Sequence, residues 1–318
     1  MLQVAGLALP FFGLIFLGFF AGKIWGRDES ELGWLNIFVI YFALPALFFQ
    51  LISRTPIGEL ANGRFVAATA LSTLLALALS FAFATLRNRG NTAESAVQAL
   101  IGGYGNVGYM GPPLALVAFG SAATVPAALI FCFDIALVFT LVPVLMAVAG
   151  RGGESKSELL ASISRKVLLH PFVLAALLGV AGAAVGVRPP DAIDRLLDSL
   201  AAASAPCALF ALGVTVASRP LERVASELPV LIAVKLLVHP LLAFLILSAF
   251  GSFQPTWIAT AVLMASLPPA ATIYVIATQY RTYVLRASSA ILVGTGASVI
   301  TVTGVLFILT HHLLPGTP

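Results

Sequence analysis

The chain has 318 residues, of which 60% are hydrophobic and 9% are charged, whereas a soluble globular domain carries roughly 25% charged residues. Together with a mean hydropathy of +1.03, this excludes an ordinary water-soluble protein. The net charge of +4 is spread between apolar stretches without forming a patch, which argues against a nucleic-acid partner.

Apolar stretches long enough to cross a bilayer follow one another along the chain, each close to the roughly 20 residues that a span needs. They are apolar on all sides, while the strands of a membrane barrel would be short and alternating. We therefore predict an all-α polytopic membrane protein with ten membrane-spanning helices in contact with lipid. The predicted spans are 4–21, 34–52, 65–86, 96–119, 124–149, 167–187, 196–217, 228–251, 257–279 and 283–309.

Lys and Arg concentrate in one of the two sets of predicted loops, twelve against four. Cytoplasmic loops retain basic residues, so the richer set is predicted to be cytoplasmic. Both termini then lie on the non-cytoplasmic side of a bacterial inner (plasma) membrane. The richer set holds Lys23, Arg27, Arg87, Arg89, Arg151, Lys156, Arg165, Lys166, Arg219, Arg223, Arg281 and Arg286, and the poorer set holds Arg54, Arg64, Arg188 and Arg195.

Several short features recur 161 residues later in the chain. The recurring features are Pro10-Phe11 with Pro171-Phe172, Leu17-Gly18 with Leu178-Gly179, and Pro45 with Pro206. We predict a first five-helix repeat over 1–149, a short cytoplasmic linker over 150–164 and a second five-helix repeat over 165–318. Because five is odd, the two repeats must be inverted, a construction known in secondary transporters.

The fourth and ninth spans each carry a double proline, Pro112-Pro113 and Pro268-Pro269, and these pairs align at an offset of 156. Proline removes a backbone donor and clashes with the preceding turn, so both helices are predicted to break. Orphaned backbone groups are costly in lipid unless they face protein, water or a ligand. Two breaks meeting near the midplane would point two positive half-helix N-termini at one site, which favours an anion. Purely structural kinks are the alternative.

Small and polar residues flank both breaks. An amide or hydroxyl can hydrogen-bond a carboxylate without keeping a charge in the bilayer, and glycines allow close backbone approach. Asn106 is the central candidate, for which a hydrogen bond between helices is the alternative. The predicted substrate-binding residues are Gly105, Asn106, Val107, Tyr109, Met110, Pro112, Pro113, Pro268, Pro269, Ala270, Ala271, Thr272 and Tyr274.

Asp134 is the one carboxylate deep inside a predicted span, and an ionisable group there is functional by default. It is a candidate proton carrier or, equally, a structural residue that is either protonated or paired with Lys235 in the eighth span. Lys235 alternatively reaches the interface by snorkelling. His170 and His239 each precede a proline, which indicates packing corners in place of a metal site. No cofactor is predicted.

The segment GNVGYMGPPL at 105–114 resembles the Asn-containing Met-Gly-x-Pro-Leu stretch of the auxin efflux carrier family, which includes plant PIN-type carriers and bacterial permeases for malonate or malate. The segment SLPPAATIYVIATQY at 266–280 resembles the Leu-Pro segment of that family's ninth span, and the resemblance covers nearly the whole chain. It implies a fold related to the bile-acid symporters, with a scaffold domain, a transport domain carrying the crossed helices, and elevator-like movement. It also implies substrate contacts at Asn106 and around Pro113 and Pro269. One departure is Thr272, where many bacterial members have Asn.

The sequence thus predicts a secondary carrier for a small organic anion, a mono- or dicarboxylate such as malonate, malate or an auxin-like acid. The spans lack clustered Glu, Gln and Asn oxygens, so coupling to H⁺ is favoured over Na⁺. The alternatives are an anion channel or a uniporter without ion coupling, and an intramembrane enzyme. We predict no enzyme, because no nucleophile with a base and no metal cluster lies at one depth. A homodimer is left open.

Overall fold

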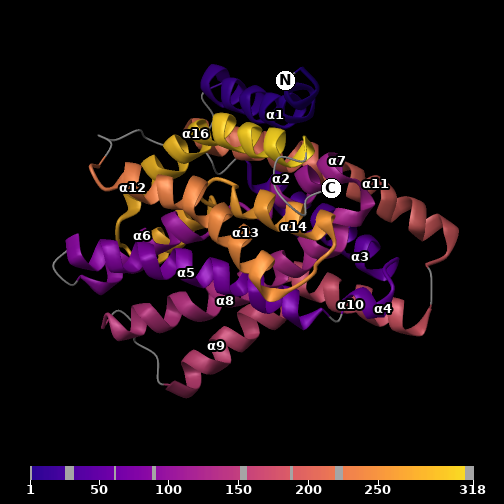
Figure 1. The fold of residues 1–318 in the computed structure, drawn as a ribbon, viewed down its shortest axis with the longest axis horizontal. Coiled ribbons are helices and arrows are strands. Elements are labelled where there is room, and N and C mark those ends of the chain that lie inside the picture. The colour runs from indigo at the N-terminus through magenta and orange to yellow at the C-terminus, as the bar shows by residue number, and fades with distance from the viewer. Residues whose placement is uncertain are drawn as a thin grey trace.

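The computed structural model describes residues 2–25, 32–60, 62–87, 91–150, 156–186, 189–218 and 225–311. Within these ranges the chain is helical, and the one strand-like contact is an isolated antiparallel bridge between Gly105 and Pro269 (Figure 1). The elements in chain order are α1 (Leu2–Trp25), α2 (Gly33–Phe38), η2 (Val39–Ala43), α3 (Leu44–Ser53), α4 (Ile57–Leu60), α5 (Gly63–Arg87), α6 (Thr92–Gly103), α7 (Gly111–Phe119), η3 (Ser121–Ala123), α8 (Thr124–Val148), α9 (Lys156–Leu168), α10 (Pro171–Val185), α11 (Asp191–Ser218), α12 (Leu228–Ala233), η4 (Val234–Val238), α13 (His239–Phe250), α14 (Pro255–Ala265), α15 (Thr272–Gln279) and α16 (Val284–Thr310).

Six of the helical stretches in the described ranges are long and apolar enough to cross a membrane. They are Gly33–Ser53, Gly63–Arg87, Ser121–Val148, Asp191–Ser218, Leu228–Phe250 and Val284–Thr310. Shorter apolar helices cover Leu9–Trp25, Pro171–Val185 and Pro255–Ala265. This is the architecture of an all-helical polytopic membrane protein, while the count of ten spans stays a prediction.

The boundaries around the predicted sixth span differ from the expectation. The span was predicted to begin at residue 167, but α9 continues to Leu168 and α10 begins at Pro171. His170 between them has an extended backbone, because a residue that precedes proline is disfavoured in the helical region. Helix α9 also occupies much of the region 150–164 that was predicted as a linker. Of the basic residues used for orientation, those outside the described ranges are Arg27, Arg89, Arg151, Arg188, Arg219 and Arg223.

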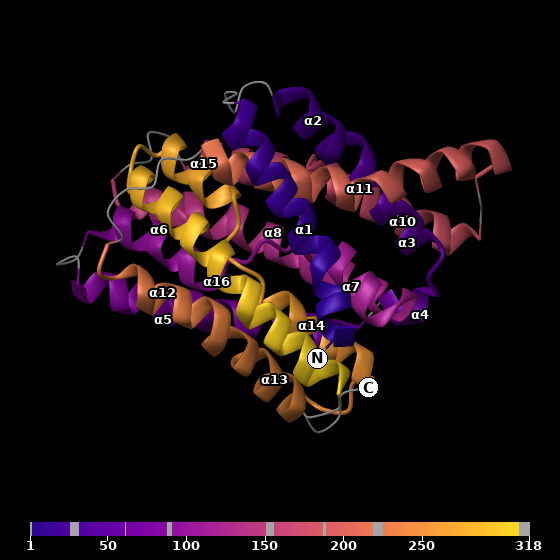
Figure 2. The same cartoon turned by 90° about the horizontal axis from the view of Figure 1, so that it is seen from above.

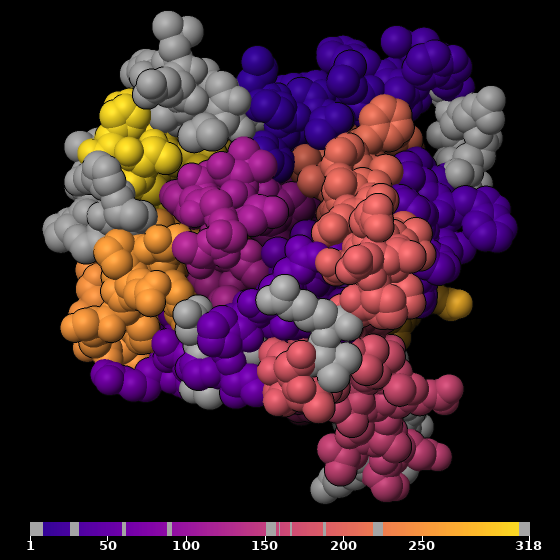
Figure 3. All heavy atoms as spheres, turned by 90° about the vertical axis from the view of Figure 1, so that its right-hand side faces the viewer, coloured from indigo at the N-terminus to yellow at the C-terminus, as the bar shows by residue number. Residues whose placement is uncertain are grey.

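The helices pack as two groups (Figure 2). The first helix group consists of α1, α2, η2, α3, α10 and α11, and the second consists of α5 to α8 and α12 to α16. Each group takes helices from both halves of the sequence, so helices far apart along the chain lie side by side. On one face of the molecule α11 lies between parts of the N-terminal segments, and α9 projects from the lower edge (Figure 3).

Glycines bring α1 and α11 into close contact within the first helix group. A Cβ at Gly18 would lie 2.1 Å from the carbonyl oxygen of Phe210, and one at Gly213 would lie 2.0 Å from that of Ile15. No side chain fits in either place, so the two backbones cross at the distance that small residues permit.

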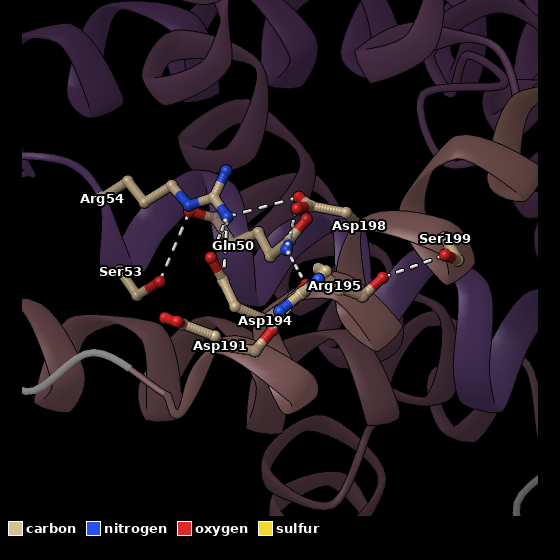
Figure 4. Close-up of polar contacts among 8 residues, drawn as sticks. All are labelled: Gln50, Ser53, Arg54, Asp191, Asp194, Arg195, Asp198 and Ser199. Carbon is tan, nitrogen blue, oxygen red and sulfur yellow. Dashed lines mark hydrogen bonds and ion pairs between the residues drawn. The ribbon is translucent and has the colours of Figure 1, made fainter.

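A cluster of polar side chains joins α3 to α11 (Figure 4). The Arg54 guanidinium donates to Asp194 at 2.9 Å and to Asp198 at 3.3 Å, and the Gln50 amide donates to Asp198 at 2.8 Å. We call these four residues the Arg54 cluster. Its charged side chains are about half exposed, so it fixes the end of α3 against α11 at the molecular surface.

Two π-helical turns, η2 and η4, each end two residues before a proline, Pro45 and Pro240. At their ends the N–H of Leu44 and of His239 donates to a carbonyl five residues back, in place of the four of an α-helix. The wider turn accommodates a proline, which cannot donate and clashes with the preceding turn. In the second case Lys235 within the turn and His239 after it are both buried.

Candidate functional site

Both predicted helix breaks are present, and the two unwound segments pair with each other. Segment 104–110 separates α6 from α7, and segment 266–271 separates α14 from α15. The N–H of Asn106 donates to the carbonyl of Pro268 at 2.8 Å, and the N–H of Ala270 donates to the carbonyl of Tyr104 at 3.2 Å. The bonds form the antiparallel bridge between Gly105 and Pro269, so each break satisfies backbone groups that the other orphans.

The two double prolines occupy different places in the two breaks. Pro112 and Pro113 lie in the first turn of α7, where their missing N–H groups cost nothing, whereas Pro268 and Pro269 lie inside the unwound segment. Helix α14 ends 162 residues after α6, and α15 begins 161 residues after α7. The helix boundaries therefore follow the offset of 161 and not the offset of 156 that aligns the prolines.

A cavity of about 310 Å³ lies between the two helix groups, against the paired segments, within the size range of small-molecule sites. The second helix group contributes Tyr104, Gly105, Asn106, Gly108, Tyr109, Phe131, Ile135, Phe139, Ala270, Ala271, Thr272 and Val275, and the first contributes Asn36, Ile40, His170, Phe172, Ala211, Leu212 and Thr215. No Lys, Arg, Asp or Glu is among these described lining residues.

About half of the predicted substrate-binding residues line this cavity: Gly105, Asn106, Tyr109, Ala270, Ala271 and Thr272. The others, Val107, Met110, Pro112, Pro113, Pro268, Pro269 and Tyr274, are not among the lining residues. Sequence reasoning missed the whole wall that the first helix group contributes. Its polar members are Asn36, His170 and Thr215, and the one local signal among them was the His-Pro pair at His170.

Asn106 lines this cavity and has an unpaired side-chain amide nitrogen. Its residue is 3% exposed, its backbone N–H is bonded to Pro268, and its side-chain Nδ2 has no hydrogen-bond partner. A buried donor left unpaired costs about 1–3 kcal/mol, so such a group needs an explanation. A ligand with an acceptor oxygen would supply the missing partner.

The N-terminus of α15 faces the same cavity. The first hydrogen bond of this helix is donated by Ile273 to the carbonyl of Ala270, so the N–H groups of Ala271 and Thr272 lie ahead of it. Both residues line the cavity. Helix N-termini attract anions through these N–H groups and the helix dipole. The N-terminus of α7, at Gly111, does not reach the cavity lining.

Behind the paired segments, four buried side chains form a continuous hydrogen-bonded chain that we call the Lys235 chain. Lys235 Nζ lies 3.1 Å from His239 Nδ1, His239 Nε2 lies 3.5 Å from Thr73 Oγ1, and Thr73 Oγ1 donates to Asp134 Oδ1 at 3.1 Å. The ammonium can only donate, so His239 accepts at Nδ1 and carries its hydrogen at Nε2. Every bond then runs in one direction, from the cation to the carboxylate.

This arrangement decides two of the open questions about Lys235. Asp134 forms no direct ion pair with it in the described structure, because Thr73 and His239 lie between them. Lys235 has 0% exposure, so the snorkelling alternative is wrong. Its ammonium also donates to the carbonyl of Ala265 at the C-terminal end of α14, where the helix dipole stabilises a positive charge.

Gly105 connects the Lys235 chain to the cavity. A Cβ at this position would lie 3.0 Å from Lys235 Cε and 3.1 Å from its Nζ. Gly105 itself lines the cavity and forms the bridge to Pro269. The ammonium thus packs directly on the rear of the paired segments, one residue away from Asn106.

Two broken helices that pair beside a cavity in a multi-pass membrane protein are typical of a membrane transporter. The family described as "Membrane transport protein" matches residues 4–306, and the chain belongs to this family, of auxin efflux carrier type, as the resemblance predicted. It is a transporter and not an enzyme. No cofactor is indicated, and no group of three His, Cys, Asp or Glu side chains in the described ranges could hold a metal ion.

Relatives match over nearly their full length. A Rhizobium meliloti (strain 1021) protein named "Putative malonate transporter" is 47% identical over 99% of this chain and 98% of its own. The "Uncharacterized transporter YfdV" of Escherichia coli (strain K12) is 28% identical over 92% of this chain and 93% of its own. An "Uncharacterized transporter" of Methanothermobacter thermautotrophicus is 26% identical over 90% of this chain and 92% of its own.

Proposed function

We propose that this transporter is a secondary carrier for a small organic anion, bound in the cavity between the two helix groups. The observation that carries the proposal is the buried, unpaired Nδ2 of Asn106 beside the N-terminus of α15. A carboxylate can accept from both of these donors. The described lining residues include no Lys or Arg, so no fixed positive charge holds the anion too tightly for release. A dicarboxylate such as malonate is the first substrate to test, since one relative is named for it.

Alternating access is proposed to arise from ten spans in two inverted repeats. The helix boundaries at the two breaks support the repeat, because they recur at nearly one offset. The cavity lies between the helix groups, so an elevator-like displacement of the second group against the first would expose it to either side. The basic-residue asymmetry supports non-cytoplasmic termini in a bacterial inner membrane.

Proton coupling is proposed to run through the Lys235 chain. Asp134 and Lys235 are ionisable groups buried within the membrane region, and the costs of burying charge make such groups functional by default. The chain places its ammonium directly behind Gly105. A change in its protonation would therefore act on the paired segments that form the anion site.

The test is thermal stabilisation of the purified protein by a panel of mono- and dicarboxylates, because a ligand that binds the native state raises its apparent stability. Asn106→Ala is the test variant. Gln98→Ala is its matched control, because Gln98 is equally buried, also has unpaired amide atoms and does not line the cavity.

We expect a carboxylate to stabilise the wild type and Gln98→Ala by several degrees and to lose this effect in Asn106→Ala. A response that survives unchanged in Asn106→Ala would refute the proposed site. No response of the wild type to any carboxylate would refute the substrate class. Saturable uptake into proteoliposomes separates a carrier from a channel.

A further inference from the structure

His170 is held in one orientation at the junction of α9 and α10. It is the N-cap residue of α10, and the N–H of Phe172 donates to its Nδ1 at 3.4 Å. Its ring contacts two aromatic rings, with centroid distances of 5.6 Å to Phe139 and 4.8 Å to Phe172. Since Nδ1 accepts, the hydrogen of the neutral ring is on Nε2. His170 is therefore a preorganised donor.

His170 also lies between two cavities. It lines the inner cavity described above and a second one of about 650 Å³ beside α9. The second cavity is lined by Tyr41, Phe139, Ala161, Ser162, Arg165, Leu169, His170 and Pro171. Phe139 and His170 belong to both linings, so the two cavities meet at these residues. Arg165 is the one Lys or Arg among the described lining residues of the two cavities.

The inner cavity offers donors from both helix groups. Asn106 and the start of α15 belong to the second helix group, whereas His170 belongs to the first. An anion with one carboxylate needs only the donors of the second helix group. An anion with two carboxylates needs a donor for its other end, and no Lys or Arg is among the described lining residues. The polar residues that the first helix group contributes are Asn36, His170 and Thr215, and we take His170 because the N–H of Phe172 orients its ring.

We propose that His170 is the specificity-determining residue for a second acidic group of the substrate. Its Nε2–H donates to the carboxylate remote from Asn106, so a short dicarboxylate bridges the two helix groups while a monocarboxylate contacts one. This inference rests on the proposed function, because it assigns one end of the same anion site. It concerns which anion is preferred, and the site itself stands without it.

The structural role of His170 can be separated from this binding role by choice of variant. Asn is among the best N-cap residues, so His170→Asn keeps an acceptor for the Phe172 N–H. Its side chain is too short to place a donor where Nε2 lies. His170→Ala removes both functions and reports the cost of the lost cap.

The experiment measures dissociation constants of the full-length purified protein for malonate, succinate, propionate and butyrate near neutral pH. In His170→Asn we expect affinity for the two dicarboxylates to fall about tenfold or more, equivalent to about 1.4 kcal/mol, and affinity for the two monocarboxylates to change less than twofold. Asn106→Ala should weaken all four.

An equal loss for mono- and dicarboxylates in His170→Asn, or no loss for either, would overturn the role of His170. If Asn106→Ala still weakens all four ligands in that case, the proposed anion site stands. If Asn106→Ala weakens none of them, the proposed function itself fails. Binding of none of the four ligands to the wild type overturns both.

Discussion

The Arg54 cluster and the Lys235 chain both join helices that are more than 100 residues apart in sequence, yet their surroundings are opposite. The charged side chains of the Arg54 cluster are 38–53% exposed, whereas Lys235 and Asp134 are 0% and 4% exposed. Exposed ion pairs contribute about 0–1 kcal/mol because water already solvates both charges. A buried charge that loses its partner costs several times more. Burial, more than geometry, therefore decides which cluster the molecule depends on.

A third cluster, around Glu227, lies between these extremes. The Glu227 carboxylate is buried and accepts from Tyr283 Oη at 2.6 Å and from Arg286 at 3.2 Å, while the arginine is half exposed. Burial by itself would raise the pKa of Glu227. The hydrogen bonds from Tyr283 and from the backbone of Glu227, together with the charges of Arg286 and Arg87, outweigh burial, so the pKa is lowered.

The largest effect is expected from Lys235→Met. This change leaves the Ala265 carbonyl without its side-chain donor and interrupts the chain to Asp134, so we expect the free energy of unfolding to fall by about 3 kcal/mol or more and uptake to be lost. Thermal unfolding and proteoliposome uptake measure both. Leu236→Met, at a neighbouring buried position, is the control. Wild-type stability and uptake in Lys235→Met would show that the chain is dispensable.

A smaller and more selective effect is expected from Asp134→Asn. Asparagine still accepts from Thr73 through its carbonyl oxygen, so the fold is retained, but the position can no longer release a proton. If Asp134 carries the coupled proton, uptake in this variant should fall about tenfold and become independent of pH. Uptake that keeps the full pH dependence of the wild type would remove Asp134 from the coupling mechanism.

The effect of Glu227→Gln on stability is expected to lie between those of Lys235→Met and Arg54→Gln. Since the pKa of the folded Glu227 lies below its ordinary value of 4.5, its contribution is fully present above pH 4.5 and is lost as pH falls through the folded value. At neutral pH the variant should be less stable by about 1–2 kcal/mol. This value includes a reduction because water screens the charges of the half-exposed Arg286 and Arg87. In acid the difference should vanish, and a difference that grows in acid would contradict this account. Unfolding midpoints across pH measure it.

The smallest effect is expected from Arg54→Gln. Its pairs with Asp194 and Asp198 are exposed, so the loss in unfolding free energy should stay below about 1 kcal/mol and shrink further as salt is added. Unfolding midpoints at low and high ionic strength measure it. A loss as large as that of Lys235→Met would refute the ranking by burial.

Some features of the fold and of the candidate site could be predicted from the sequence, and others could not. The breaks, Asn106 and Thr272 were predictable because glycines and prolines determine local backbone geometry at those points. The wall formed by Asn36, His170 and Thr215 was not, since helices that are apolar all round do not reveal which faces meet. The link from Lys235 to Asp134 was anticipated as a pairing, but Thr73 and His239 as its intermediates follow from tertiary packing alone.

The bridge between Gly105 and Pro269 has a consequence for how this chain can vary. A side chain at position 105 would press on the end of Lys235, which would have to shift by a few tenths of an ångström, and the backbones of both segments must keep their register to retain two buried bonds. A larger residue at 105 is therefore easier to accommodate with a shorter one at 235. Variation at the two breaks is therefore tied together, and substrate preference is freer to diverge through the opposite wall, where His170 lies.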